Sequence, residues 1–214
     1  MAGRYAFTLP PETTRQLFGV TGGEWLEPRV NISPGRTGAV IRMTDGAREL
    51  AAMKWGLRPH WWDPAKAKNQ PFNAPADGIA SKPFFRDAFR HRRCVVPATA
   101  YYEWDRGPTP PKPFQLTVDG GAPFCFAGLW ESWKSPDGEE LQTYAIVTAA
   151  PNRLVRTWSS SMPVILDREE IDNWLAQSDR TLLEAMLDPF PAHRMDAKAV
   201  STRLNNSAYE GSIQ

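Results

Sequence analysis

The start of the chain could supply a nucleophile. Met1 is followed by Ala2, a small residue that normally permits removal of the initiator methionine. The mature chain would then begin with a free α-amine whose pKa is about 7.7–8.0, so that a sizeable fraction is unprotonated at neutral pH. An unprotonated amine can attack an electrophilic carbon. We therefore expect amine chemistry at Ala2 if Met1 is removed.

A long segment without regular periodicity, residues 59–80, contains the adjacent tryptophans Trp61 and Trp62. Ordered long loops are disproportionately functional. Neighbours on a strand would point to opposite faces, so only one of the two could be buried. We expect indoles here that stack on unpaired bases, whereas Trp55, on a predicted strand, is expected in the core. The candidate phosphate contacts are Arg4, Arg29, Arg58, Lys66, Lys68, Arg86, Arg90, Arg92 and Arg93, and the alternative is an ordinary solvated surface.

Several classes of function receive no support from composition. The net charge of +1 argues neither for nor against a nucleic-acid partner, because a basic stripe can be offset elsewhere. Cys94 and Cys125 lie in apolar contexts and are expected to be buried thiols rather than a disulfide. Zinc-type spacing of cysteine and histidine is absent, so we expect no metal and no cofactor. Signal and membrane-spanning runs are also absent, which predicts a cytoplasmic protein. The sequence carries no signal of oligomeric state.

Hydrophobic patterning predicts an α+β fold, a single domain over residues 1–214 in which strands predominate. Strands are predicted over residues 4–8, 39–43, 49–55, 94–97, 100–104, 114–118, 124–130, 144–148 and 163–166, with an extended segment into a turn at 30–35 and a final strand or extended arm at 199–204. Helices are predicted over residues 11–18, 81–90, 169–175 and 181–186. We expect Thr8 to cap the first helix, Gly22 and Gly23 to end it, and a turn at Asp45–Gly46.

Seven blocks along the chain, taken in order, resemble the SOS response-associated peptidase (SRAP) family. They are residues 1–5 (MAGRY, where the family has Cys at position 2), 31–35 (NISPG), 54–62 (KWGLRPHWW), 72–74 (FNA), 92–104 (RRCVVP running into YYEW), 161–166 (SMPVIL) and 200–206 (VS and LNN). No single block is decisive, but seven in this order are specific. The resemblance implies one domain with a mixed, barrel-like sheet and flanking helices.

The resemblance also implies a function. Members of the family recognise abasic sites in single-stranded DNA, and the Cys at position 2 forms a thiazolidine crosslink with the ring-opened sugar aldehyde. A Glu in the Tyr-Glu-Trp block and a His before Met-Pro assist proton transfer, while an Asn-Ala-Arg motif holds DNA and the N-terminus. The peptidase label reflects a proposed autoproteolytic role.

The present chain keeps some of these family residues and replaces others. Glu103 and Asn73 match the family's catalytic Glu and its Asn. Ser159 stands at the position of the His, and Ala2 at that of the nucleophile. Three further positions depart from the family pattern. Pro75 stands where the Asn-Ala-Arg motif has its arginine, and the shorter Asp77 stands where an acid follows that motif. Ser161 stands where the family has an arginine before Met-Pro, and the resemblance implies a phosphate contact for that arginine.

Three hypotheses follow. The first is an SRAP-like protein of the SOS response to DNA damage that binds single-stranded or abasic DNA, with thiazolidine crosslinking lost or impaired and at best slow lyase chemistry. The second is a non-catalytic module on the same fold with another protein or nucleic-acid partner. The third is a peptidase. A deliberate Cys-to-Ala exchange would leave the other motifs intact, so the changes at Pro75, Ser159 and Ser161 favour natural divergence.

Overall fold

The computed structural model describes residues 3–65 and 70–213. Its centre is a closed sheet in which strands pair in the order β5, β4, β7, β10, β11, and β11 pairs in turn with β5. The bounds of these strands are Thr37–Thr44 (β4), Ala47–Trp55 (β5), Arg93–Ala98 (β7), Phe124–Lys134 (β10) and Glu140–Ala149 (β11). The closing pair is parallel and the others are antiparallel. The expected barrel-like core is confirmed.

Short strands extend this barrel. They are β2 (Val20–Gly23) beside β5, β6 (Asn73–Pro75) and β12 (Met162–Pro163) beside β11, and β13 (Ile165–Leu166) beside β10. The predicted turn between β4 and β5 is present. Asp45 and Gly46 both have positive φ, 49° and 80°, as a two-residue hairpin turn requires.

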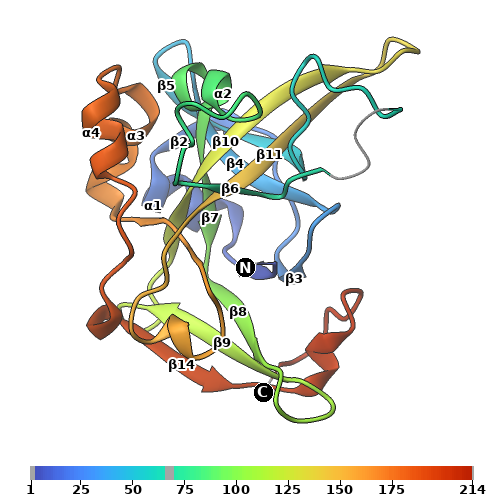
Figure 1. The fold of residues 1–214 in the computed structure, drawn as a ribbon, viewed down its shortest axis with the longest axis vertical. Coiled ribbons are helices and arrows are strands. Elements are labelled where there is room, and N and C mark those ends of the chain that lie inside the picture. The colour runs from blue at the N-terminus through green and yellow to red at the C-terminus, as the bar shows by residue number, and fades with distance from the viewer. Residues whose placement is uncertain (1–2, 66–69, 214) are drawn as a thin grey trace.

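A second sheet lies at the lower end of the molecule (Figure 1). Its order is β14, β9, β8, β1, β3, with bounds Met195–Ala199 (β14), Lys112–Val118 (β9), Ala100–Asp105 (β8), Tyr5–Phe7 (β1) and Arg29–Ile32 (β3). Only Thr99 separates β7 of the barrel from β8 of this sheet. The segment that carries Glu103 therefore leaves the barrel directly, and the N-terminal strand β1 lies against it.

Four helices of the described part of the chain lie outside the barrel: α1 (Pro11–Phe18), α2 (Arg86–His91), α3 (Ile171–Ala176) and α4 (Arg180–Ala185). The chain also forms the 3₁₀ turns η1 (Val155–Thr157), η2 (Arg168–Glu170), η3 (Ala192–Arg194) and η4 (Thr202–Asn205), and η3 and η4 precede and follow β14 of the second sheet. Asp167 and Glu170 form a reciprocal capping box at η2, which leads into α3. Among the described residues, no helix is long and apolar enough to cross a membrane.

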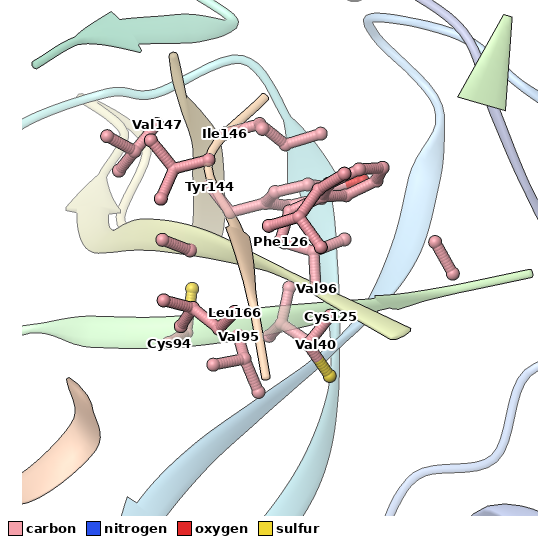
Figure 2. Packing of buried hydrophobic residues seen from close by; sticks show 14 of the residues in the cluster. Val40, Cys94, Val95, Val96, Cys125, Phe126, Tyr144, Ile146, Val147 and Leu166 are labelled. Carbon is pink, nitrogen blue, oxygen red and sulfur yellow. The ribbon is translucent and has the colours of Figure 1, made fainter. Parts of the chain in front are cut away.

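Buried side chains fill the barrel, and Figure 2 shows part of this cluster, including Cys94, Cys125 and Tyr144. Both cysteines are buried free thiols, as expected. The hydroxyls of Tyr5 and Tyr144 share a hydrogen bond of 2.8 Å, which satisfies two polar atoms inside the core. Trp55 is 1% exposed, which confirms its expected place in the core.

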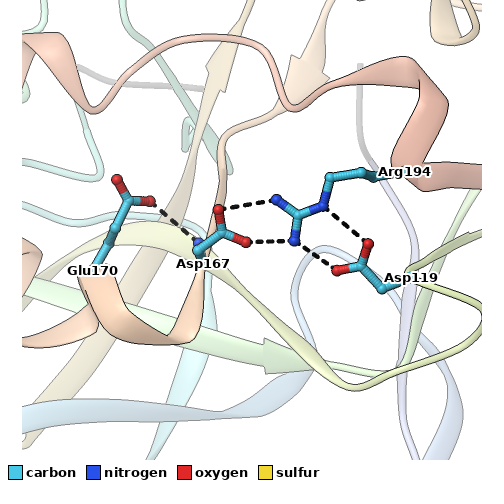
Figure 3. A network of polar contacts seen from close by, with 4 residues as sticks. All are labelled: Asp119, Asp167, Glu170 and Arg194. Atoms are coloured by element: carbon cyan, nitrogen blue, oxygen red, sulfur yellow. Dashed lines mark hydrogen bonds and ion pairs between the residues drawn. The ribbon is translucent and has the colours of Figure 1, made fainter.

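Arg194 joins two parts of the lower molecule that are distant in sequence. It donates to both carboxylate oxygens of Asp119, after β9, at 2.9 and 2.7 Å. It also donates to both carboxylate oxygens of Asp167, before η2, at 3.0 and 2.7 Å (Figure 3). The planar guanidinium suits two bidentate pairs at once.

Some sequence expectations were wrong at element ends. Pro10, not Thr8, is the N-cap of α1, and Gly19 in the left-handed conformation ends this helix because a residue without Cβ adopts positive φ readily. Gly22 and Gly23 lie instead in β2. The C-terminal strand covers Met195–Ala199 rather than residues 199–204, since the pairing register with β9 ends at Ala199. The helix expected over 81–90 is regular only over Arg86–His91.

Candidate functional site

A pocket of about 450 Å³ opens where the N-terminal segment meets the second sheet. It is lined by Gly3, Arg4, Glu103, Trp104, Arg106, Pro111 and Asn205. Glu103 is 5% exposed, and it is the carboxyl among the residues that line this pocket. The pocket thus brings the buried carboxyl of Glu103 together with Gly3, the residue directly after position 2. Ala2 itself lies outside the described residues.

Burial controls the proton affinity of Glu103. Loss of solvation raises the pKa of this carboxyl above its ordinary value of 4.5. A hydrogen bond with Ser159 and the positive charge of Arg106 oppose that rise. Glu103 therefore keeps its proton up to a higher pH than an exposed glutamate does, which suits a general acid or base.

Ser159 reaches Glu103 from a different part of the chain. It follows η1, and the preceding residue, Trp158, stacks on Phe114 of β9 with ring centroids 4.8 Å apart. Phe114 is the partner of Glu103 in the pairing of β8 with β9. Ser159 therefore lies within hydrogen-bond reach of Glu103, although a serine hydroxyl cannot supply the titration of a histidine.

Arg4 is held by the protein itself. Its guanidinium donates to Asn31 Oδ1 at 2.7 Å and to the carbonyl of Leu204 at 3.0 Å, and it lies 5.3 Å from the ring centre of Trp104. Asn31 in turn donates to the carbonyls of Asn206 and Tyr209. These contacts explain why the blocks at 1–5, 31–35 and 200–206 belong to one pattern: they tie both ends of the chain to the pocket.

Asn73, Pro75 and Ser161 lie on either side of β11. Asn73 and Pro75 belong to β6, which pairs in parallel with β11, and Pro75 is opposite Thr148. On the other side of β11, Thr148 pairs with Pro163, two residues after Ser161. Asn73 is 7% exposed and its side chain has protein contacts. Neither Pro75 nor Ser161 carries a positive charge, so the arginines of the family pattern have no replacement at these two positions.

The two adjacent tryptophans have different environments. Trp61 is 48% exposed and meets Phe84 edge to face, so its stacking role stays a prediction. Trp62 is 7% exposed and packs edge-on against Trp133. The expectation of an open stacking face at Trp62 is therefore wrong, because Arg58 and Trp133 already cover this indole.

Several of the predicted phosphate contacts have partners within the protein. Arg93 is 7% exposed and donates to main-chain carbonyls of Phe89, Arg90, Trp174 and Gln177, where α2 and α3 end. Cations stabilise helix C-termini in this way. The other assigned contacts are Arg92 with Glu131 at 2.7 Å, Arg29 with Glu210 at 3.9 Å, and Arg58 between Trp62 and Trp133 at 4.7 and 4.9 Å from their ring centres.

Two more of these arginines belong to another region. Arg86 and Arg90 line a separate pocket with Arg180, between α2 and α4, at the upper end of the molecule (Figure 1). Lys66 and Lys68 lie outside the described residues. Sequence reasoning did not select Arg106 and Asn205, and the signal for Arg106 was its position three residues after the motif acid Glu103. Within the described residues, no group of three or more histidine, cysteine or acidic side chains could hold a metal ion.

The fold and the pocket together define a class of protein, a closed barrel whose N-terminal segment lies beside a buried glutamate. The family model described as SOS response associated peptidase (SRAP) matches residues 1–207. The chain therefore belongs to the SRAP family.

Similar proteins carry more specific names. The chain is 34% identical over 187 residues to abasic site processing protein YoqW of Bacillus subtilis, covering 86% of this chain and 83% of that protein. It is 28% identical over 252 residues to abasic site processing protein HMCES of Xenopus tropicalis, covering 97% and 75%. A crystal structure from Bacteroides thetaiotaomicron has a TM-score of 0.86 at 26% identity, covering 94% and 92%, and one from Bordetella bronchiseptica has 0.83 at 29%, covering 93% and 99%.

Proposed function

We propose that this protein binds single-stranded DNA at an abasic site and holds the ring-opened sugar in the pocket at Glu103. The observation that carries the proposal is the buried carboxyl of Glu103 in a pocket that Gly3 also lines. The names of the relatives, abasic site processing proteins, support the same substrate. On this proposal the protein acts in the cytoplasm during the SOS response to DNA damage.

The proposed chemistry is limited to a reversible bond. The α-amine of Ala2, freed by removal of Met1, adds to the sugar aldehyde and forms an imine with release of one water molecule. Glu103 moves the proton that the departing hydroxyl needs. Because Ala2 has no thiol, the second, ring-closing bond of a thiazolidine cannot form, and hydrolysis returns the amine and the aldehyde. Any lyase activity through β-elimination would start from the same imine.

A trapping experiment tests this proposal. The protein is incubated with abasic and with intact single-stranded DNA, with and without borohydride, and the products are separated on a denaturing gel. We expect a covalent product only with abasic DNA and only with borohydride, which reduces the imine to a stable amine. An N-terminal tag that blocks the amine is the control and should abolish trapping. The Glu103→Gln variant should trap more slowly by roughly 10²-fold.

The other outcomes point to the alternatives. DNA binding without trapping would indicate a non-catalytic module on the SRAP fold, which the changes at Ala2, Pro75 and Ser161 would suit. Absence of DNA binding at low salt would contradict both DNA hypotheses and leave a protein partner. Cleavage of a peptide substrate would be required for the peptidase hypothesis.

A further inference from the structure

The pocket at Glu103 contains two arginines in very different situations. Arg4 is engaged by Asn31, by the Leu204 carbonyl and by the face of Trp104. Arg106 is exposed, and within residues 3–65 and 70–213 its guanidinium has no hydrogen bond or ion pair. Its charge is nevertheless close enough to Glu103 to favour the ionised carboxylate. Arg106 is thus a pocket cation that is available to a ligand.

The backbone that carries Arg106 is anchored on both sides. Asp105 Oδ1 accepts the N–H of Gly107 at 2.9 Å, which holds the turn that follows β8. At the far end of the same loop, Asn205 donates to the carbonyl of Pro111 at 3.0 Å. Asn205 also accepts the indole N–H of Trp104 at 2.7 Å. The loop is therefore positioned by the protein while the guanidinium remains open to the pocket.

Two positions at which the family pattern has arginine carry no charge in this chain. Pro75 on β6 and Ser161 before β12 stand where the sequence pattern of the family has arginine, and both are neutral. A single strand that enters the pocket carries a negative charge on every phosphate, and proteins meet this charge with Arg or Lys. Of the two arginines that line the pocket, Arg106 has the unoccupied guanidinium.

We infer that Arg106 binds the backbone phosphate beside the abasic sugar, so that this protein recognises the strand's charge from the β8–β9 loop and not from the β6 and β12 side. The inference rests on the proposed function. It assigns a phosphate-binding role to a residue that the motif comparison did not select. It also predicts that the contact is independent of base sequence, because phosphates carry no base identity.

Salt dependence of binding measures this contact directly. The probe is a fluorescein-labelled single-stranded oligonucleotide with one abasic site, and anisotropy gives its Kd from 50 to 200 mM salt. We expect Arg106→Ala to weaken binding at low salt and to reduce the slope of log Kd against log salt by about 0.7, the value for one phosphate of a single strand. Arg106→Lys, which keeps the charge, should retain the slope.

A matched control separates this contact from a general loss of charge. Arg180→Ala in α4 removes one positive charge at the other end of the molecule and should leave both Kd and slope unchanged. An unchanged slope in Arg106→Ala, or an equal loss in Arg180→Ala, would overturn the inference. If the wild-type protein fails to bind the abasic probe at low salt, it is the proposed function that fails. Thermal melting of each variant confirms that it is folded.

Discussion

Trp158 stacks on Phe114 with an angle of 29° between the ring planes, and the next residue, Ser159, shares a hydrogen bond with Glu103. Phe114 pairs with Glu103 across β8 and β9, so one aromatic contact connects the segment after η1 to the strand that carries the carboxyl. Two residues 56 positions apart in the chain thereby share one hydrogen bond. We therefore expect the site to depend on this packing as well as on the two polar residues.

Removing that contact should slow the chemistry without abolishing binding. We expect Trp158→Ala to lower the rate of borohydride trapping on abasic DNA by roughly tenfold, because Ser159 loses its support and Glu103 its hydrogen-bond partner. DNA affinity should stay close to that of the wild type. Trp25→Ala, which removes an indole beneath Arg15 elsewhere on the surface, is the control and should trap at the normal rate. Equal rates for both variants would contradict the positioning role.

Restoring a thiol at position 2 should make the adduct permanent. An amine and a thiol on adjacent carbons can both bond to the aldehyde carbon, and the resulting ring resists hydrolysis. We therefore expect Ala2→Cys to give a covalent product with abasic DNA on a denaturing gel without borohydride. Ala2→Ser, of similar size, should still need borohydride. If Ala2→Cys also requires the reductant, the sugar does not reach the N-terminus as proposed.

The raised pKa of Glu103 makes stability depend on pH. A carboxyl whose pKa is higher in the folded chain than its ordinary 4.5 binds protons more tightly when folded. The free energy of unfolding then falls as the pH rises from 4.5 through the raised pKa. We expect Glu103→Gln, which carries no charge to bury, to melt at a higher temperature than the wild type at pH 8. This difference should shrink toward pH 4.5, and a constant difference would argue against a burial penalty.

Gly38 is required by the paired tyrosines of the core. A Cβ at this position would overlap the hydroxyls of Tyr5 and Tyr144. We expect Gly38→Ala to lower the free energy of unfolding by roughly 1–3 kcal/mol, as overpacking of a core does. Gly22→Ala is the control, because no atom lies within 4 Å of a Cβ there, and it should change stability by less than about 0.5 kcal/mol. Urea denaturation of both variants measures the difference.

The Arg194 network should stabilise the protein in a manner sensitive to pH and salt. Hydrogen bonds from Arg194 lower the pKa of Asp119 below its ordinary 3.8, so their contribution is present above pH 3.8 and is lost as the pH falls through the lowered pKa. We expect Arg194→Ala to melt below the wild type at pH 7, with a smaller gap below pH 4 and in high salt. Arg168→Ala, a nearby exposed cation, should melt like the wild type. A gap independent of both conditions would exclude an electrostatic cause.

Much of the fold is local enough to be predicted from the sequence. Short continuous apolar runs marked the strands around Val40, Val95 and Phe126, and Asp45–Gly46 marked the hairpin that joins β4 to β5. Motif order indicated the family and selected Glu103. The ends of α1 and of the last strand were misplaced, because several glycines compete as helix terminators and pairing with β9, not local propensity, decides where β14 stops.

The sequence by itself determined the residue types available to the chemistry: a residue without a thiol at position 2, an acid at Glu103, and uncharged residues at Pro75 and Ser161. Tertiary structure alone decided which arginines are free. Arg93 and Arg106 are the same residue type, and both lie in or close to the motif block at 92–104. In the fold, however, Arg93 is buried among helix-terminal carbonyls, whereas Arg106 lines the pocket. Burial and hydrogen bonding arise from contacts between segments far apart in the chain, and local sequence carries no record of them.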